Sequence, residues 1–441
     1  MTASHNSSGT SPEGSRPGAS FSAASDLPAT TSRGTDAARG LTRRRLALGS
    51  VGLLAAVGLS ACGADSGDDG GTEASGSAGA ASSSPAKAPG VKVTPAADAS
   101  MVNPVDPVVV TTDAGTLTAV TVTASGSGEK AEGAIGKDGT EWRSAKPLAF
   151  DEVYTVDYTA RNGDRDTTGQ SVFSTVDAAH EADVGINVKD GQTYGVWQVV
   201  EFTFSEPVSA KDAVEKAISV EGAHKDGAFR WYSDQKLRFR PRDPWTPRST
   251  VKVSANILGK DLGNGMIGNG NKTVTFKTGP EQRAYVDNNT KTLVAYVDGK
   301  ETGTWPVTLG DAEWPSTTGK KVILEQAASY KFNAGSLNLK PGDSHYYPPF
   351  DASNVSRLTW SGEFVHQALP SAYSVLGVAN VSHGCVGMPP EGASYIYNTF
   401  RPGDMVEVVN TNYPQADPDD GLGDWNIPFQ NYPNEKWHGN W

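Results

Sequence analysis

The chain has 441 residues, which is too long for one ordinary hydrophobic core, so we expect several domains. Hydrophobic residues make up 37% and charged residues 20%, with 49 glycines, a profile typical of β-rich modules joined by many turns. The formal net charge is −12, and an acidic chain does not concentrate polyanions at its surface, which argues against nucleic acid as a partner.

The N-terminal residues 1–62 are typical of an export signal that follows a disordered Ser-, Gly- and Ala-rich leader. Three arginines precede an apolar run of 16 residues that ends at Ala61, shorter than the roughly 20 residues of a stable membrane span. The next residue is Cys62, and "LSAC" resembles the lipobox of bacterial lipoproteins. The resemblance implies a lipid on Cys62 that anchors the chain at the outer face of the cell membrane. An uncleaved membrane anchor is the alternative.

A flexible linker is predicted over residues 63–99, followed by two small β-sandwich domains over 100–179 and 180–280. Short runs such as "TLTAVTVT" and "WQVVEFTF" alternate with a period of two and are separated by Gly- and Asp-rich turns. One short helix is predicted over 211–219. Neither domain shows a concentrated set of titratable groups.

A third domain is predicted over residues 281–410, with hairpin turns at Asn288–Asn289 and Asp298–Gly299. An initial proline, an early glutamate and spaced apolar residues predict a short helix over 389–400. The remaining segment, 411–441, ends in 21 residues that include five large aromatic side chains. A disordered tail would not hold so many apolar rings, so we expect this segment to pack back onto the third domain.

Cys385 is one of only two cysteines, and it has no disulfide partner if Cys62 carries a lipid. The neighbouring His383 and the start of the predicted helix both favour a thiolate. Gly384 and Gly387 leave the backbone uncrowded, and the N–H groups of Gly384 and Cys385 could form an oxyanion hole. One cysteine with two histidines is a poor zinc set, so we expect no metal.

The stretch "SHGC" (382–385), with His366 upstream, resembles the catalytic motif of the L,D-transpeptidase (YkuD) family of cell-wall enzymes. Fifteen residues separate His366 from the motif, which fits the family's spacing. The segments "WSGEFVH" (360–366) and "DGLGDWNIP" (420–428) resemble actinobacterial members, which carry two immunoglobulin-like domains ahead of the catalytic one. The resemblance implies a mainly β chain: two Ig-like sandwiches, a YkuD-type β-sandwich with a short helix, and an aromatic-rich C-terminal subdomain.

The same resemblance implies roles for individual residues. Cys385 would be the nucleophile, His366 the base that takes its proton, and His383 a support for the thiolate or the oxyanion. No cofactor is implied. Substrate contacts are implied for Ser361, Gly362, Ser382, Gly384, Gly387 and Tyr347.

The implied reaction is acyl transfer between peptidoglycan stem peptides. The thiolate attacks a tetrapeptide stem and expels D-alanine, and an amine of a second stem then takes the acyl group to form a 3→3 cross-link. Carbapenem β-lactams, which acylate the family, are implied as covalent inhibitors.

Two residues depart from the family's pattern. Gly387 stands where the family usually has Asn, and Gln367 stands where actinobacterial relatives often have Ser or Gly. If that hydroxyl orients the imidazole of His366, a backbone carbonyl must replace it here. These departures leave open an Ig-like lipoprotein that binds the cell wall without catalysis. A hydrolase that uses water as the acceptor also stays open, and a sortase-type enzyme is the less fitting thiol alternative because its Thr-x-Thr-Cys setting is absent.

Overall fold

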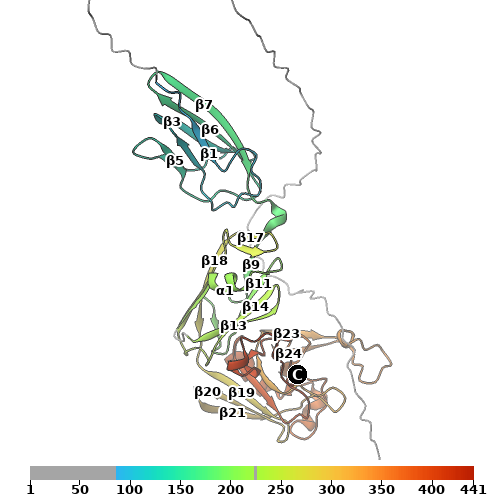
Figure 1. Ribbon diagram of the computed structural model, residues 1–441. Coiled ribbons are helices and arrows are strands. Elements are labelled where there is room, and N and C mark those ends of the chain that lie inside the picture. Colours follow the sequence, from blue (N-terminus) through green and yellow to red (C-terminus); the bar gives the residue numbers. More distant parts are fainter. Residues whose placement is uncertain (1–85, 223–225) are drawn as a thin grey trace, which may run out of the picture. The chain divides into compact units, whose positions relative to one another are not determined.

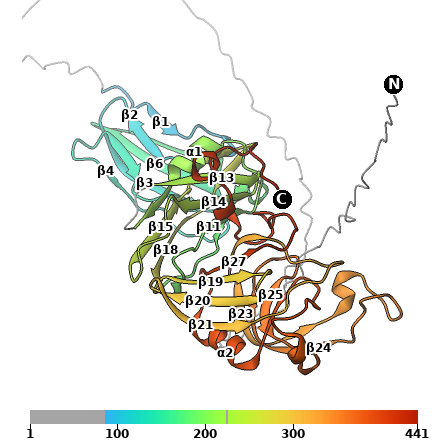
Figure 2. The same ribbon diagram turned by 90° about the horizontal axis from the view of Figure 1, so that it is seen from below.

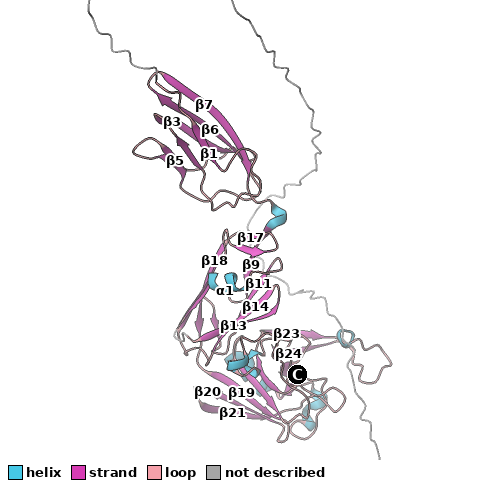
Figure 3. Cartoon of the chain, in the orientation of Figure 1, coloured by secondary structure: helices cyan, strands magenta, loops and turns pink. Residues whose placement is uncertain are grey.

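The structure is a computed structural model that describes residues 86–222 and 226–441 (Figure 1). The predicted export signal with Cys62 and most of the linker lie outside the described residues. Strands predominate over helices throughout the described part, so the prediction of a mainly β chain is confirmed (Figure 3). No helix in these residues is long and apolar enough to cross a membrane.

The first β unit packs two sheets, ordered β1-β2-β5-β4 and β3-β6-β7, around a core that includes Trp142 and Phe173. The expectation that the linker extends to residue 99 is wrong, because Val91 pairs with Thr112 and packs against this core. Its strands are β1 (Val91–Thr94), β2 (Val109–Thr112), β3 (Thr116–Ala124), β4 (Gly133–Ile135), β5 (Glu141–Ser144), β6 (Val153–Asn162) and β7 (Arg165–Ser174).

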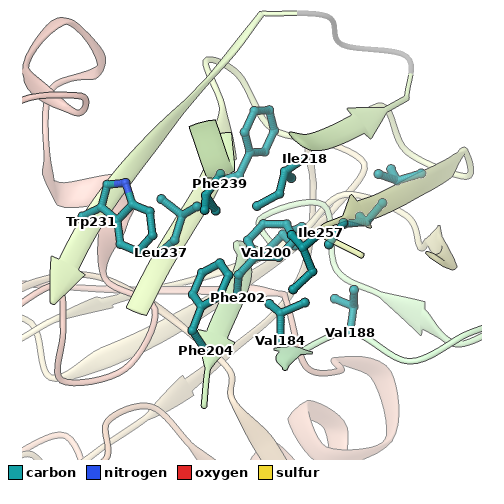
Figure 4. Packing of buried hydrophobic residues seen from close by; sticks show 14 of the residues in the cluster. Val184, Val188, Val200, Phe202, Phe204, Ile218, Trp231, Leu237, Phe239 and Ile257 are labelled. Carbon is teal, nitrogen blue, oxygen red and sulfur yellow. The ribbon is translucent and has the colours of Figure 1, made fainter. Parts of the chain in front are cut away.

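The second unit packs the sheets β13-β14-β11-β9 and β10-β18-β15-β12, with a small third sheet β16-β17-β8. Phe202 and Leu237 lie in its core and are fully buried (Figure 4). Its elements are the 3₁₀ turn η1 (Ala178–His180), β8 (Glu181–Ala182), β9 (Val184–Ile186), β10 (Thr193–Tyr194), β11 (Val200–Phe204), α1 (Lys211–Ala217), β12 (Ile218–Glu221), β13 (Gly227–Ser233), β14 (Lys236–Pro241), β15 (Thr250–Asn256), β16 (Asp261–Gly263), β17 (Met266–Gly268) and β18 (Asn271–Thr278). The predicted helix exists but ends earlier, since Ile218 already pairs with Ala255 in the sheet.

The third unit packs a five-stranded sheet, β21-β20-β19-β27-β22, and a four-stranded sheet, β23-β24-β25-β26, with α2 against strands of both (Figure 2). Ile396 of α2 is buried in the shared core, and the predicted helix is confirmed. Its elements are β19 (Gln282–Asp287), β20 (Thr292–Val297), β21 (Lys300–Pro306), β22 (Gly319–Val322), β23 (Glu325–Phe332), η2 (Ala334–Leu337), β24 (Phe350–Arg357), β25 (Phe364–Gln367), η3 (Pro370–Val375), β26 (Val386–Met388), α2 (Pro390–Thr399) and β27 (Met405–Val409).

The two predicted hairpin turns of this unit differ in outcome. Asp298 and Gly299 have φ angles of 48° and 77°, so the tight turn between β20 and β21 is confirmed. The connection at Asn288–Asn289 is a longer loop that ends at Lys291, whose φ is 50°. The left-handed residue needed to reverse the chain is therefore the lysine rather than an asparagine.

The C-terminal segment, which contains η4 (Asp424–Asn426) and η5 (Phe429–Asn431), packs on the second unit as well as on the third. Arg230 of β13 donates to the backbone carbonyls of Asn434 (2.6 Å) and Trp437 (3.0 Å), and Tyr432 is fully buried. The prediction that this segment packs back onto the third domain did not include these contacts with the second unit, in which buried arginines satisfy its carbonyl groups.

The second unit also contributes to a charged cluster that was not predicted from the sequence. Arg238 of β14 is fully buried and donates to Glu201 (2.7 Å), Asp419 (3.2 Å) and Asp424 (3.1 Å). The expectation that this unit has no concentration of titratable groups is wrong. Two of the three carboxylates come from the C-terminal segment, so the cluster joins that segment to the sheet.

Candidate active site

Strands β25 and β26 bring His366 and the cysteine motif to one face of a sheet. The two strands are parallel, with His366 opposite Gly387, and Cys385 directly precedes β26. Because side chains alternate along a strand, Cys385 and Gly387 face the same side as His366. All three line one pocket of about 380 Å³. The other lining residues are Thr308, Phe332, Tyr347, Phe350, Ala368, Leu369, Ser371, Ala372, Val375, Val381, Ser382 and His383.

The thiol of Cys385 is 7% exposed and packs in an apolar cluster with Phe364 and Val355. Its Sγ makes a long contact, 3.6 Å, with the carbonyl of Gly362. Burial raises the pKa of Cys385 to about 12. The expectation that the surroundings favour a thiolate is wrong, because burial dominates and β26 separates the cysteine from the start of α2. At neutral pH the thiol therefore needs a proton acceptor.

His366 has the properties of that acceptor. It is 8% exposed, and its Nδ1–H donates to the carbonyl of Gln367 at 2.7 Å. The backbone carbonyl expected to orient the imidazole in place of a hydroxyl is thus present. Burial lowers the pKa of His366, which favours the neutral ring. With the proton on Nδ1, the lone pair of Nε2 is left to accept a proton.

His383 is held by a segment that sequence reasoning did not connect with it. Its Nε2–H donates to the carbonyl of His345 at 2.8 Å, and its ring lies 5.1 Å from the ring of Tyr347. Burial raises the pKa of Tyr347 to about 12, and the nearby Cys385 adds to the shift. His345 lies 38 residues before His383, between β23 and β24, so no local pattern indicated the contact.

Ser382 and Gly384 shape the loop before the cysteine. The Ser382 hydroxyl donates to the carbonyl of Cys385 at 2.6 Å and accepts from the Gly384 N–H at 3.2 Å. Gly384 has a φ of 113°, a conformation that favours glycine. Its N–H is engaged by the serine, so the predicted oxyanion hole cannot use this donor as the loop stands. Ser382 lines the pocket, whereas Gly384 does not.

Ser361 and Gly362 lie outside the pocket lining. The carboxylate of Asp420 accepts from the N–H of Ser361 at 2.7 Å and from its hydroxyl. Desolvation raises the pKa of Asp420. This anchoring fixes the turn that presents the Gly362 carbonyl to the Cys385 sulfur, so the two residues are placed beside the nucleophile rather than in the cavity.

Gly387 is in the pocket wall, and a side chain there would collide with Thr308. A Cβ added at Gly387 would lie 2.9 Å from the methyl carbon of Thr308. The Thr308 hydroxyl donates to the carbonyl of Ala379 (2.9 Å) and accepts from the N–H of Val381 (3.0 Å), which holds its methyl in place. The space that the family's usual asparagine would take is filled by Thr308.

A buried ion pair behind the cysteine was also missed. Glu363 accepts from the N–H and hydroxyl of Thr317 at 2.7 and 2.8 Å, and from the ammonium group of Lys321. Both charged side chains are nearly inaccessible, and their separation of 42 residues gave no local signal. Among the described residues, no group of three or more His, Cys, Asp or Glu side chains is arranged to hold a metal ion.

The chain matches two protein families. Residues 99–261 match a bacterial Ig domain, and residues 281–408 match the L,D-transpeptidase catalytic domain. Both matches lie in the part of the chain that forms the three β units.

Individual proteins match over more of the chain. L,D-transpeptidase 2 of Mycobacterium tuberculosis is 33% identical over 327 residues, which cover 74% of this chain and 79% of that protein. L,D-transpeptidase 5 of the same organism is 27% identical over 361 residues, 79% of this chain and 77% of that protein. Among solved structures, that of the LD transpeptidase LdtMt1 in complex with imipenem is 27% identical, with a TM-score of 0.45, and covers 51% of this chain and 97% of that chain.

Proposed function

The chain belongs to the L,D-transpeptidase family, and from that premise we propose that Cys385 is the nucleophile of a peptidoglycan transpeptidase that forms 3→3 cross-links. One observation carries the proposal: a buried neutral thiol and a buried histidine with a free lone pair line the same pocket. This pairing supplies both the nucleophile and the group that activates it.

In the first step, Nε2 of His366 takes the proton of the Cys385 thiol while the sulfur attacks the carbonyl carbon of the third residue of a tetrapeptide stem. The bond from that carbon to the terminal D-alanine then breaks, and the leaving amine takes the proton from His366. The product is a thioester on Cys385. Because burial raises the pKa of the thiol, the attack depends on this transfer of the proton to His366.

In the second step, the side-chain amine of another stem attacks the thioester. His366 accepts the amine proton and returns a proton to the departing sulfur, which restores the enzyme. The apolar rings of Phe332 and Phe350 line the pocket in which the thioester would form.

Two further parts of the proposal concern partners and location. The structure of LdtMt1 was solved with imipenem, and we expect the same drug to acylate Cys385 in this chain. Cys62 would carry the lipid that anchors the protein at the outer face of the membrane, as its lipobox-like setting suggests. The Ig-like domains, 100–179 and 180–280, would then separate the anchor from the catalytic domain, 281–410, and from the C-terminal subdomain, 411–441.

The test uses purified protein that carries Cys62→Ser, so that Cys385 is its only thiol. With a tetrapeptide stem, mass spectrometry should detect a 3→3 dimer, and imipenem should add its full mass to the protein. The Cys385→Ala variant should give neither product and should keep the thermal unfolding profile of its parent. A cross-linked dimer from that variant would refute the assignment, and an unmodified parent would favour the non-catalytic cell-wall binder.

A further inference from the structure

The turn at residues 361–364 contacts the Cys385 sulfur through two backbone groups. The carbonyl of Gly362 lies 3.6 Å from Sγ, and the backbone N–H of Phe364 donates to the sulfur. The carbonyl can accept from the thiol and the N–H stabilises the thiolate, so the two groups together set where the sulfur lies and how readily it becomes charged. Glu363 stands between them in the chain, and its conformation therefore determines the position of both groups.

The side chain of Glu363 is anchored outside the pocket lining, on residues 316–321, which we call the support. Its carboxylate accepts from the N–H and the hydroxyl of Thr317 at 2.7 and 2.8 Å, and from the ammonium group of Lys321. That ammonium group also donates to the carbonyl of Thr317 at 2.7 Å. Lys321 is 2% exposed and Glu363 is 8% exposed, so little water competes for these hydrogen bonds and the carboxylate has one favoured position.

The same support holds the loop that carries the cysteine. Ser316 is 1% exposed, and its hydroxyl donates to the carbonyl of Gly384 at 2.7 Å and accepts from the N–H of Gly310 at 3.0 Å. Gly384 directly precedes Cys385 in the chain. One segment therefore holds both the loop of the nucleophile and the turn that contacts it.

Stability alone does not account for the burial of this ion pair. Taking two charges out of water costs about as much as their attraction returns, and apolar side chains of similar volume often stabilise a fold equally well. Apolar side chains would not reproduce the hydrogen bonds that direct the Glu363 carboxylate to Thr317 and Lys321. These bonds fix the backbone on either side of Glu363.

We propose that the ion pair of Glu363 and Lys321 positions the nucleophile for acylation. By holding the turn on the support, the pair keeps the two backbone groups of the turn on the Cys385 sulfur. Both are positioning residues, because neither lines the pocket. The effect on acylation rests on Cys385 being the nucleophile, as proposed above, whereas the effect on the turn does not.

The experiment separates position from stability in the full chain that carries Cys62→Ser. Glu363→Leu with Lys321→Met, the apolar double variant, exchanges the pair for side chains of similar volume, which is often neutral or stabilising. Each single substitution instead leaves one partner unpaired. Glu363 raises the pKa of Cys385 and Lys321 lowers it, so removing both charges changes the electrostatics at the sulfur less than removing one.

Two further double variants serve as rescue and control. Glu363→Gln with Lys321→Met, the amide double variant, has no charges but keeps an oxygen and an NH₂ group that can bond to Thr317. Lys272→Met with Asp183→Asn removes an ion pair of the second unit and should leave the acylation rate unchanged.

Urea unfolding should show lower midpoints for Glu363→Leu and Lys321→Met alone, and a midpoint at or above that of the parent for the apolar double variant. Acylation of Cys385 by imipenem, followed by intact mass, should nevertheless have a maximal rate about 10- to 100-fold below the parent, because the nucleophile has lost its alignment. The half-saturating drug concentration should stay near that of the parent. The amide double variant should recover to within about threefold of the parent rate, which is less than 1 kcal/mol.

An apolar double variant with both the stability and the maximal rate of the parent would show that the pair is only structural. If that variant does not fold, Thr317→Val decides, since it removes one donor to Glu363 and keeps the shape of the side chain. Its maximal rate should fall by about threefold, a fraction of the effect of one charge-assisted hydrogen bond. An unchanged rate would overturn the proposal.

Amide hydrogen exchange of residues 358–366 tests the turn without any acylation. Protection should fall by about tenfold in the apolar double variant and return in the amide double variant. Equal protection in the parent and the apolar double variant would show that the pair does not hold the turn. If imipenem does not acylate the parent itself, the proposed function fails, and the exchange data still decide what the pair does to the turn.

Discussion

Arg238, where β14 meets the C-terminal segment, and Cys385, beside β26, are both buried ionisable groups, but their surroundings differ. The Arg238 guanidinium donates to Glu201, Asp424 and the carbonyl of Pro418. Desolvation lowers the pKa of Arg238, but the charges of Asp424 and Glu201 more than offset it, and the pKa ends well above its ordinary value. The Cys385 sulfur makes a long contact with the Gly362 carbonyl, and burial raises the pKa of the thiol to about 12 although a hydrogen bond from the Phe364 backbone opposes the shift.

The difference distinguishes a residue with a structural role, Arg238, from one with a chemical role, Cys385. Arg238 is charged and fully paired, so its removal leaves unpaired charges and its presence holds two parts of the chain together. Cys385 is uncharged, and its charged form is poorly stabilised by the protein, so its reactivity depends on a neighbouring base. Substitutions at buried positions can show which of these two behaviours a group follows.

The largest effect is expected from His366→Asn, which can still donate to the Gln367 carbonyl but has no basic nitrogen at the position of Nε2. Acylation by imipenem at pH 7 should fall by about 10²- to 10⁴-fold, the usual contribution of a general base. Because burial lowers the pKa of His366, the parent rate should begin to fall only below the ordinary histidine value of about 6.5.

Alkylation by iodoacetamide sharpens this test. In His366→Asn only the free thiolate reacts, so the rate should rise about tenfold per pH unit up to pH 9, since burial keeps the pKa of the thiol far above that range. In the parent, His366 accepts the proton and the rate should level off above neutral pH. Parallel profiles for the two proteins would show that His366 is not the base.

Arg238→Ala should cost about 3–5 kcal/mol of stability, the range for breaking a buried ion pair on one side. The loss arises because Asp424, which is fully buried, and Glu201 are left without the guanidinium that pairs with them. Urea unfolding followed by tryptophan fluorescence measures it. Arg248→Ala, which breaks an exposed pair with Asp298, is the control and should shift the curve far less. Equal shifts for both variants would contradict the structural role of the cluster.

The same contrast shows which features of the fold and the site could be predicted from the sequence. The strand alternation, the helix at 390–399 and the spacing from His366 to Cys385 are local patterns, and they predicted the fold class and the pair of residues in the pocket. Two of the carboxylate partners of Arg238, Asp419 and Asp424, lie more than 180 residues further along the chain, and the sequence of β14 is that of an ordinary strand. The raised pKa of Cys385 was equally hidden, because burial depends on Ala352 and Val355 from another strand.

Gly387→Asn introduces the residue that the family usually has at this position, and we expect it to lower both the stability and the acylation rate of this chain. The new Cβ would meet the Thr308 methyl at 2.9 Å, and two hydrogen bonds prevent Thr308 from turning aside. Overpacking of this kind costs about 1–3 kcal/mol and should slow acylation as well.

The double variant Gly387→Asn with Thr308→Ala removes the obstructing methyl and tests that reason. It should recover most of the stability that the single substitution loses, in the same urea assay. The double variant should therefore lose less free energy of unfolding than the sum of the losses of the two single variants, as expected for residues in contact. If the losses of the two single variants simply add, the clash with Thr308 is not what destabilises Gly387→Asn.

The smallest effect is expected at Asp404, a buried group whose pairing lies between the two extremes. One oxygen, Oδ2, accepts from the N–H of Arg401 at 2.9 Å, while Oδ1 is buried with no hydrogen-bond partner among the described residues. Desolvation raises the pKa of Asp404 well above its ordinary value of 3.8. A raised folded-state pKa contributes stability that is complete below the unfolded pKa and is lost as the pH rises through the folded one.

Asp404→Asn removes that titration, so the variant and the parent should be about equally stable near pH 4 and diverge as the pH rises. At pH 7 the variant should be more stable by on the order of 1 kcal/mol, the cost of one unsatisfied buried polar group. Thermal unfolding from pH 4 to 8 measures the difference. Asp298→Asn is a control of opposite sign, because the hydrogen bond from Arg248 lowers the pKa of Asp298. The parent should keep a constant advantage over that variant from pH 4 to 8 and lose it only as the pH falls below the ordinary value of 3.8. If the parent instead becomes more stable than Asp404→Asn as the pH rises, the fold stabilises the charged form of Asp404, as it does for Arg238.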